Sequence, residues 1–338
     1  MSTAATTTPT AAPRRPQRSR VSGIVDLLRG VPILGPAAAL LLACVFFATQ
    51  TDRFLTGANF SLILQQVMVV GTLAIGQTLV ILTGGIDLSN GMIMALSSVR
   101  MTGLAANSGL NPFLAILVGL AVCVAFGLLN GWLTTAIGLP SFIVTLGTFN
   151  IAYALVRIYT TATVTSVPDP MLLFGETFGI GSTQISYGSL LMLALFVVAG
   201  FVLRSTRAGR AVYAVGDNPE AARLAGIRTN RVLLGVYTVA ALSYGIAGLL
   251  LVARTGVGDP QAGQTGNLDS ITAVVLGGTS LLGGRGHIVG TLVGALIVGV
   301  FRNGLQLMGV GSIYQVLITG ILVILAVSVD YLSHRGGR

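Results

Sequence analysis

The sequence predicts an all-α, polytopic membrane protein with about ten transmembrane helices. Hydrophobic residues make up 53% of the 338-residue chain and charged residues only 9%, which is too apolar for a water-soluble core of this size. Apolar runs of about 20 residues, the length of a helix that crosses a bilayer, recur along the chain. The arginines between these runs collect mainly on one side of the predicted membrane, as the positive-inside rule requires.

The chain divides into a leader, a membrane domain and a short tail. Residues 1–30 are rich in Thr, Ala and Pro and then in Arg, which predicts a disordered cytoplasmic leader. The membrane domain extends over residues 31–333 and includes a cytoplasmic loop at 204–231, and residues 334–338 form a cytoplasmic tail. Its ten predicted spans lie at residues 32–50, 60–83, 90–106, 112–136, 141–158, 188–203, 232–253, 268–284, 288–307 and 312–332.

The arginines predict how these spans are oriented. All nineteen cations are arginine, and fourteen of them lie in the leader, the loop 204–231, the connection at Arg285 and the tail. The opposite loops hold only Arg53 and Arg254. This asymmetry places both termini of a ten-span chain in the cytoplasm.

Three arginines, Arg100, Arg157 and Arg302, fall within predicted spans, toward their outer ends. One interpretation is that their side chains extend along the helices and place the charge at the membrane surface. The other is that they line an outward-facing vestibule or contact an acidic soluble partner. The sequence leaves both interpretations open.

The residue types disfavour several activities. Without lysine, the chain has neither a Schiff-base lysine nor a lysine-containing phosphate-binding loop. The net charge of +9 follows from topology, so nucleic acid is not an expected partner. His287 and His334 are isolated, and Cys44 and Cys123 lie in apolar runs, so we expect no metal ligands and no catalytic residues. The prediction is a protein that is not an enzyme.

The polar residues favour transport of a neutral solute. The carboxylates lie in loops, tails or at span ends, so the chain lacks the buried acids of an ion-coupled carrier, and energy is expected from another protein. Uncharged polar side chains inside the spans can form a path for a hydroxyl-bearing solute, or simply hydrogen-bond a neighbouring helix. These candidates are Gln65, Gln66, Gln77, Asn130, Asn150, Tyr153, Asn303 and Gln306.

Glycines predict close helix packing and two helix breaks. Gly290 and Gly294 are spaced to let two helix backbones approach each other. Residues 82–88 and 275–281 resemble each other at an offset of 193 residues, and each contains a Gly-Gly pair at which a helix can unwind. The similarity suggests an internal duplication.

The loop 204–231 contains a short helix with both ends marked. Asn218 is a suitable N-cap, Pro219 suits the first helical position, and Glu220 favours the positive end of the helix dipole. Gly226 can adopt the left-handed conformation that ends a helix. So short a helix is unstable alone. It is expected either to enter a groove on a soluble subunit or to rest on its own bundle.

Three segments carry a resemblance to a known family. Residues 218–227 resemble the EAA-type cytoplasmic loop of permease subunits in bacterial ABC importers. Residues 76–89 and 268–286 are similar to segments of the ribose/xylose/fructose branch of that family. The likeness extends from residue 54 to residue 330.

The resemblance implies a fold, a location and partners. It implies the cobalamin-type permease fold in the bacterial cytoplasmic (inner) membrane, and an importer of two permease chains, two ATP-binding subunits and an extracytoplasmic sugar-binding protein. ATP and Mg²⁺ would bind to the ATPase, and this chain would bind no cofactor. The residues implied to form the ATPase-coupling helix are Asn218, Pro219, Glu220, Ala221, Ala222 and Gly226. Those that match the family motif or serve in gating are Gly84, Gly85, Asp87, Leu88, Gly277 and Gly278.

Together these observations predict the transmembrane subunit of an ATP-driven importer for a neutral monosaccharide or polyol such as ribose, fructose or xylose. The sequence does not choose the sugar, because the resemblance implies that the binding protein sets most of the selectivity. The alternative is a self-sufficient carrier, either facilitative or coupled to an ion gradient. A membrane enzyme is the least favoured interpretation.

Overall fold

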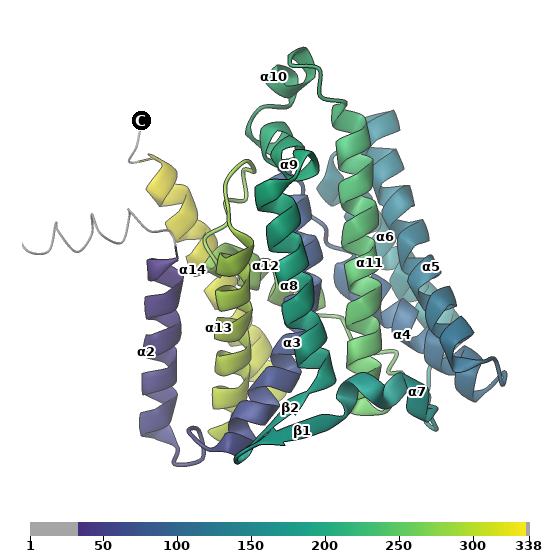
Figure 1. Ribbon diagram of the computed structural model, residues 1–338, viewed down its shortest axis with the longest axis vertical. Coiled ribbons are helices and arrows are strands. Elements are labelled where there is room, and N and C mark those ends of the chain that lie inside the picture. The colour runs from purple at the N-terminus through teal and green to yellow at the C-terminus, as the bar shows by residue number, and fades with distance from the viewer. Residues whose placement is uncertain (1–32, 336–338) are drawn as a thin grey trace, which may run out of the picture.

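The computed structural model describes residues 33–335, so the predicted leader 1–30 and the last three residues of the predicted tail lie outside the described residues. The fold is a helical bundle (Figure 1). Its long helices are α2 (Leu34–Gln50), α3 (Gly57–Leu82), α4 (Asn90–Ala106), α5 (Pro112–Trp132, continued by a π-helical turn Leu133–Ile137), α6 (Ser141–Tyr159), α8 (Tyr187–Ser205), α11 (Thr229–Thr255), α13 (Ile288–Leu307) and α14 (Ser312–Arg335).

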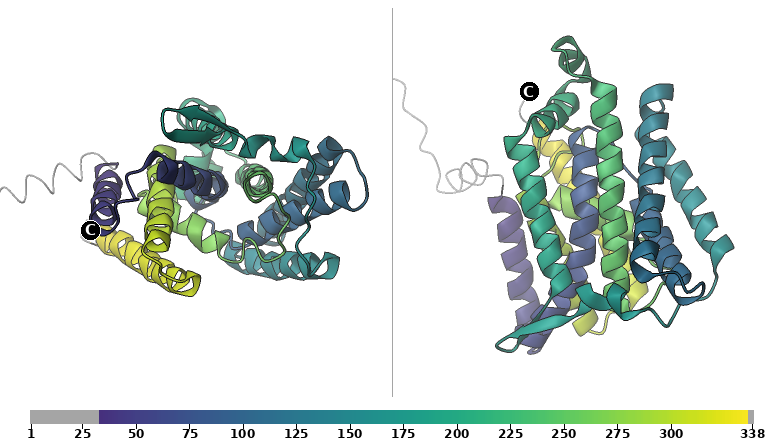
Figure 2. Two further views of the ribbon diagram at one scale, coloured as in Figure 1. Left: turned by 90° about the horizontal axis from the view of Figure 1, so that it is seen from below. Right: turned by 45° about the vertical axis from the view of Figure 1, so that its right-hand side comes forward.

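Two helices form the centre of the bundle. α3 and α11 pack against each other, and α5, α4, α8 and α13 surround them (Figures 1 and 2). Short elements mark the two ends. α9 (Arg207–Asp217) and α10 (Pro219–Leu224) lie at one end, here called the α10 end. The strands β1 (Thr177–Ile180) and β2 (Thr183–Ser186) and the helix α7 (Asp169–Leu172) lie at the other, the hairpin end.

The bundle has the composition of a polytopic membrane protein, as the sequence predicts. Among the described residues, six helices are long and apolar enough to cross a membrane: α3, α5 with its π-helical extension, α6, α8, α11 and α13. The outer helices expose large apolar side chains such as Leu117, Ile158 and Val197. Side chains of this kind are stable on an outer surface that faces lipid.

The predicted span 268–284 is wrong as a full-length helix. The helix in this region, α12, extends only over Gly266–Leu276. Its 11 residues correspond to about 16 Å at 1.5 Å per residue, roughly half of a bilayer core. Four of the eight residues from 277 to 284 are glycine. Three of them, Gly278, Gly283 and Gly284, have positive φ angles, so the backbone leaves the helical conformation.

The β1–β2 hairpin is absent from the predictions, which treat this part of the connection between α6 and α8 as a loop. The two strands pair antiparallel, with Thr177 opposite Ser186. The Ser61 hydroxyl of α3 accepts a hydrogen bond from the Gln184 amide at 2.7 Å. The hairpin is therefore held by contacts with a distant helix, which a local sequence pattern does not contain.

Glycines let helices approach closely where the sequence predicts it. A β-carbon on Gly290 would meet the carbonyl oxygen of Gly277, and one on Gly294 would meet that of Ala273, so α12 and α13 are in backbone contact. Both Gly-Gly pairs also interrupt helices. In the pair Gly84–Gly85 the first glycine is left-handed (φ 78°), whereas in the pair Gly277–Gly278 it is the second (φ 82°). The two breaks are therefore offset by one residue.

We expect Gly294→Val to lower the midpoint of thermal unfolding by about 5 °C, because overpacking a close helix contact costs about 1–3 kcal/mol. The matched control is Gly147→Val on α6, where a β-carbon would meet nothing within 4 Å. Thermal unfolding followed by size-exclusion chromatography measures both variants. Equal midpoints for the two would contradict the close contact between α12 and α13.

Candidate functional site

The short helix α10 has the ends that the sequence predicts. The Asn218 side chain accepts a hydrogen bond from the Ala221 amide at 2.9 Å, and Pro219 occupies the first helical position. At the other end the Ile227 amide donates to the Ala222 carbonyl at 3.0 Å, and Gly226 is left-handed with φ 84°. These bonds define a helix capped at both ends by residues of its own loop.

One face of α10 rests on the chain and the rest is exposed. Ala222 is buried against the bundle, whereas Ala221 and Glu220 are exposed. Leu224 is 84% exposed at the tip of the helix. Glu220 and Arg223 form a surface ion pair at 2.9 Å. Sequence reasoning missed Leu224, because a single exposed leucine is common on protein surfaces and gives no signal of a partner by itself.

A junction of glycines joins α9 to the end of α3 and to the α12–α13 loop. A β-carbon on Gly216 would meet the Leu82 carbonyl oxygen and lie 2.6 Å from the Gly284 nitrogen. One on Gly283 would lie 2.7 Å from the Gly84 nitrogen. The Gly284 amide donates to the Leu82 carbonyl at 3.0 Å. Three backbones thus meet at a point that only glycine allows, here called the glycine junction (residues 82–84, 216 and 283–284).

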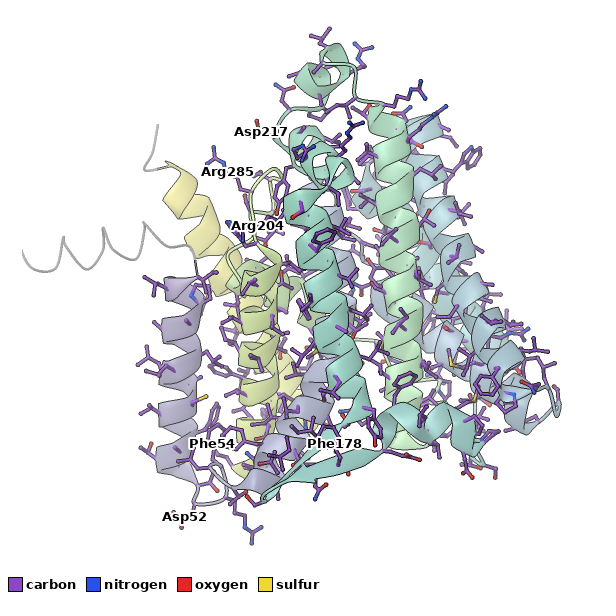
Figure 3. The ribbon with its side chains drawn as sticks, viewed as in Figure 1. Asp52, Phe54, Phe178, Arg204, Asp217 and Arg285 are labelled. Atoms are coloured by element: carbon purple, nitrogen blue, oxygen red, sulfur yellow. The ribbon has the colours of Figure 1, made fainter. Side chains whose placement is uncertain are left out.

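A tyrosine adds a second link between α9 and the same loop. The Tyr213 hydroxyl donates to the Gly286 carbonyl at 2.9 Å. Burial raises the pKa of Tyr213 above its ordinary value, so the phenol keeps its proton and remains a donor at neutral pH. α9 is therefore attached to the end of α3 and to the α12–α13 loop. Asp217, at the end of α9, and Arg285, in that loop, both lie at the α10 end (Figure 3).

The motif segment after Gly84 lies inside the bundle, where polar side chains bind it. Asp87 is buried and accepts hydrogen bonds from the Ser89 amide at 2.8 Å and the Ser89 hydroxyl at 2.6 Å. The Asn130 amide group donates to the Ser89 hydroxyl at 3.1 Å and accepts from Thr148 at 2.8 Å. The segment is thereby joined to α5 and α6.

A second set of bonds joins α3, α4 and α12. The Asn90 side-chain amide donates to the side-chain oxygen of Gln77 and to the Ser270 hydroxyl, both at 2.8 Å. Gln77, Asn90 and Asn130 are fully buried. Two of the predicted path residues, Gln77 and Asn130, therefore hold helices together, which is the simpler of the two roles left open by the sequence.

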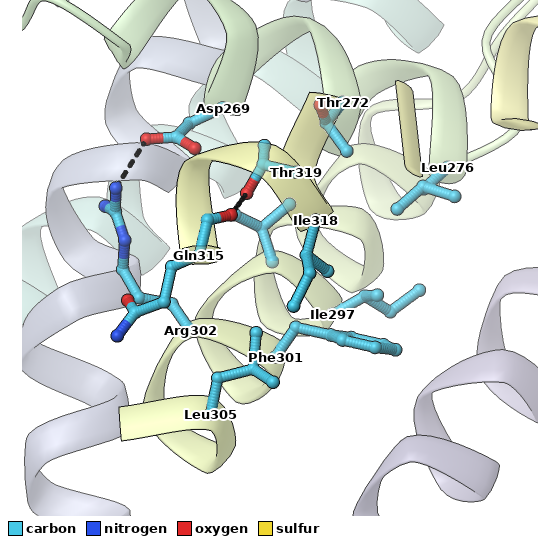
Figure 4. Close-up of a pocket in the computed structure, with 11 residues that line it drawn as sticks. Asp269, Thr272, Leu276, Ile297, Phe301, Arg302, Leu305, Gln315, Ile318 and Thr319 are labelled. Atoms are coloured by element: carbon cyan, nitrogen blue, oxygen red, sulfur yellow. Dashed lines mark hydrogen bonds and ion pairs between the residues drawn. The ribbon is translucent and has the colours of Figure 1, made fainter. Parts of the chain in front are cut away.

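A cavity of about 540 Å³ lies toward the hairpin end, between α3, α11, α12, α13 and the loop 256–265. Its polar lining includes Gln66, Arg254, Asp269 and Arg302. Asp269 and Arg302 form an ion pair at 3.2 Å, which joins α12 to α13 (Figure 4). The buried side-chain oxygen of Gln66 has no hydrogen-bond partner among the described residues. The cavity thus combines an ion pair with the half-buried carboxamide of Gln66.

Among the eight predicted path residues, all of them within the described chain, Gln66 alone lines this cavity. Gln65 is half-buried, and Gln306 is exposed outside it. Asn150 and Tyr153 are exposed on α6, and Asn303 donates to Asn59 at 2.8 Å.

The three arginines of the predicted spans have different surroundings. Arg302 lines the cavity, which agrees with the vestibule interpretation. Arg100 lies over the Tyr159 ring at 4.4 Å, and Arg157 lies 5.6 Å from the centre of the Tyr153 ring. Cation–π contacts of this kind stabilise a guanidinium at the edge of an apolar surface.

Among the side chains that the structure describes, no group of three or more His, Cys, Asp or Glu residues comes together to hold a metal ion. The arrangement instead offers three things. It has a cavity for a small solute, an exposed helix for a partner, and a glycine junction that connects this helix to the interior.

The family model of permease components of the branched-chain amino acid transport system matches residues 59–327. The chain belongs to this family, and it is therefore a membrane transport permease. The match includes the cavity, the glycine junction and α10.

Its relatives include sugar import permeases. The chain is 44% identical to the fructose import permease protein FrcC of Rhizobium meliloti, over 90% of this chain and 86% of that protein. It is 41% identical to the ribose import permease protein RbsC of Bacillus subtilis strain 168, over 88% and 92% of the two chains. The xylose transport system permease protein XylH of Escherichia coli K12 is 32% identical over 88% and 91%.

We expect Arg302→Gln alone to cost more stability than Arg302→Gln combined with Asp269→Asn, because the single change leaves a buried carboxylate without its cation. The single change should cost about 2 kcal/mol, below the ~3–5 kcal/mol of a fully buried pair, since the Arg302 side chain is 39% exposed. Thermal midpoints of the purified variants measure the difference. Arg100→Gln, which breaks no ion pair, is the control. If the stability losses of the two single variants simply add up in the double variant, the energetic coupling between Asp269 and Arg302 is contradicted.

Proposed function

We propose that this permease is the transmembrane subunit of an ATP-driven importer for a neutral monosaccharide of the fructose, ribose and xylose class. The observation that carries the proposal is the identity of 44% with a fructose import permease over nine-tenths of the chain. The exposed helix α10 supports an external source of energy. The cavity supports a small polar solute.

The relatives favour a sugar over an amino acid, although the family takes its description from branched-chain amino acids. The cavity lining offers both charged groups and amides, since Arg254 and Asp259 line it beside the Asp269–Arg302 pair. Gln66, Gln261 and Gln264 offer carboxamides that suit hydroxyl groups. The volume of about 540 Å³ falls within the ~300–1,000 Å³ of small-molecule sites.

The orientation follows from the arginines. The α10 end, with six of the nineteen arginines between residues 204 and 231, would face the cytoplasm of the bacterium, and the hairpin end the outside. We further propose that the chain has roughly ten transmembrane spans, a cobalamin-type permease fold and both termini in the cytoplasm. Its leader would be residues 1–30, its membrane domain residues 31–333 and its tail residues 334–338. The short helix α12 would then be one of the ten only as a partial span.

The proposed partners follow from the same assignment. A soluble ATPase would receive α10, with Ala221 and Leu224 as its exposed contacts and Asn218, Pro219 and Gly226 holding the helix ends. ATP and Mg²⁺ would bind to the ATPase and not to this chain. A second permease chain and an extracytoplasmic solute-binding protein would complete the importer.

The glycine junction gives the coupling a route. A displacement of α10 would act through α9 on the backbone contact between Gly216 and the α12–α13 loop. That loop continues into Gly277 and α12, whose Asp269 lines the cavity. Two arrangements of this junction, biased by nucleotide on one side and solute on the other, would close and open the inner gate at Gly84, Gly85, Gly277 and Gly278.

One observation favours the alternative of a self-sufficient, ion-coupled carrier. Asp87 is fully buried in the bundle and forms no ion pair with the described residues. A buried carboxylate of this kind can carry a proton or bind a cation. Its hydrogen bonds to Ser89 give it a structural role instead, and the transport assay below separates the two functions.

The proposed function is tested with the permease reconstituted in vesicles with its cognate ATPase and solute-binding protein. We expect ATP-dependent uptake of radiolabelled fructose, ribose or xylose, and no uptake of leucine. Leu224→Asp should lower uptake and ATPase co-purification at least tenfold, because it places a charge in an apolar contact worth ~2 kcal/mol or more. Leu173→Asp, an exposed leucine at the hairpin end, should retain the ATPase. Leucine uptake, or flux that follows a proton gradient without ATP, would refute the proposal.

We expect Gly216→Ala to uncouple the importer. The added β-carbon would collide with the Leu82 carbonyl and separate α9 from the glycine junction, while α10 stays exposed. Uptake should fall about tenfold or more, whereas the ATPase should still bind and hydrolyse ATP. The control is Gly235→Ala on α11, where a β-carbon meets nothing within 4 Å. Normal uptake by Gly216→Ala would contradict the route through the junction.

A further inference from the structure

A groove of about 1530 Å³ at the α10 end is separate from the cavity proposed for the solute and lies between α8, α9, the start of α13 and the α12–α13 loop, where it reaches Gly278 and Gly284. We propose that it binds an anionic phospholipid of the inner leaflet, with an acyl chain along its apolar wall and the phosphate at its basic rim. The proposal depends on the orientation of the chain, and its test does not involve transport.

The wall of the groove is apolar and open. It includes Phe196, Val197 and Phe201 of α8 and Val289 and Leu292 of α13. Val197, Phe201 and Val289 are 72%, 65% and 53% exposed. A concave apolar surface of this size on a membrane protein is stable only in contact with other apolar groups, and the hydrocarbon of the bilayer supplies them.

The rim carries cations from three separate elements. Arg204 lies in the last turn of α8, Arg210 lies on α9, and Arg285 lies in the α12–α13 loop two residues before His287. The two ion pairs formed by the described residues involve other arginines, so these three have no carboxylate partner there. Asp217 is an acidic residue close to the rim, because its backbone packs on Gly284. It lies at the same end of the bundle as Arg204 and Arg285 (Figure 3). The rim remains positive overall.

The order of apolar wall and basic rim matches a lipid molecule. Along α8, Phe196 precedes Arg204 by eight residues, which is about 12 Å in a helix. In an inner-leaflet lipid the acyl chain lies in the bilayer interior and the phosphate lies toward the cytoplasm. The apolar wall and the basic rim of the groove follow each other in the same order. Arginine binds phosphate oxygens through paired donors, and basic pockets between helices on this side of a membrane suit anionic headgroups.

Two other occupants of the groove, the leader of this chain and a free phosphate ion, match its surface less well. Ile33 lines the groove, so residues 1–32 continue from its edge. The twelve residues before Ile33 carry one arginine, Arg29, and one acidic residue, Asp26, so they bring no net negative charge to the basic rim. A free phosphate would satisfy the arginines but would leave the apolar wall uncovered. An anionic phospholipid satisfies both surfaces.

The test is a titration of the delipidated full-length chain with phosphatidylglycerol or phosphatidylcholine, with the first bound lipid counted by native mass spectrometry. We expect phosphatidylglycerol to bind more tightly. The triple variant R204Q/R210Q/R285Q should weaken it about a hundredfold, roughly fivefold for each arginine. The matched control R207Q/R228Q/R231Q makes the same charge change at the same end outside the groove, and it should bind as the unaltered chain does.

Further variants separate the outcomes. Val197→Trp, which fills the wall, should weaken both lipids. If the triple variant fails to fold, R285Q alone, in an exposed loop, should weaken phosphatidylglycerol about fivefold. If both triple variants lose the same affinity for phosphatidylglycerol, the effect is one of overall charge and the proposed site is refuted. Binding that appears only after deletion of residues 2–31 would assign the groove to the leader, and full competition by glycerol phosphate would assign it to a soluble phosphate.

Discussion

The rest of the structure depends on finding hydrogen-bond partners for the peptide groups at a point where a helix breaks inside an apolar bundle. Between α3 and α4 the chain leaves the helical conformation at Gly84, and the peptide groups that follow lose their helical partners. Side chains of α6 replace them, since Ser141 accepts from the Ile86 amide and Thr145 from the Leu88 amide, both at 3.1 Å. Because an unpaired peptide group in an apolar environment costs several kcal/mol, these bonds fix the position of α6 relative to α3 and α4.

The same break connects the interior of the bundle to its surface. Gly84 turns the chain where Gly283 and Gly216 can approach it, so three glycine backbones share a space that side chains would fill. The buried network and the glycine junction are therefore two consequences of one turn. One makes the bundle rigid on the α6 side, and the other attaches the exposed helix α10 to α12 and, through Asp269, to the cavity.

The sequence predicted features that depend on neighbouring residues and missed those that depend on distant ones. The caps of α10 are local, so Asn218, Pro219 and Gly226 were sufficient to predict it. Hydropathy located most helices to within a few residues but overextended α12, because the predicted span included the glycine-rich segment 277–284 as helix. The path residues were the weakest prediction: Gln66 lines the cavity, whereas Gln77 binds another helix. Both lie on α3, a helix buried along most of its length, and hydropathy does not show which neighbour a polar side chain meets there.

By itself the sequence determined the class of protein, the helical composition, the topological asymmetry of the arginines and the capped helix, because each follows from local composition or spacing. The tertiary structure decided which polar side chains are structural and which face a cavity, that Arg302 finds Asp269, and that glycines from three segments meet. These outcomes arise from contacts between residues far apart in the chain. Such contacts depend on the rotation and depth of each helix in the bundle, and apolar periodicity does not specify either quantity when a helix is surrounded on all sides.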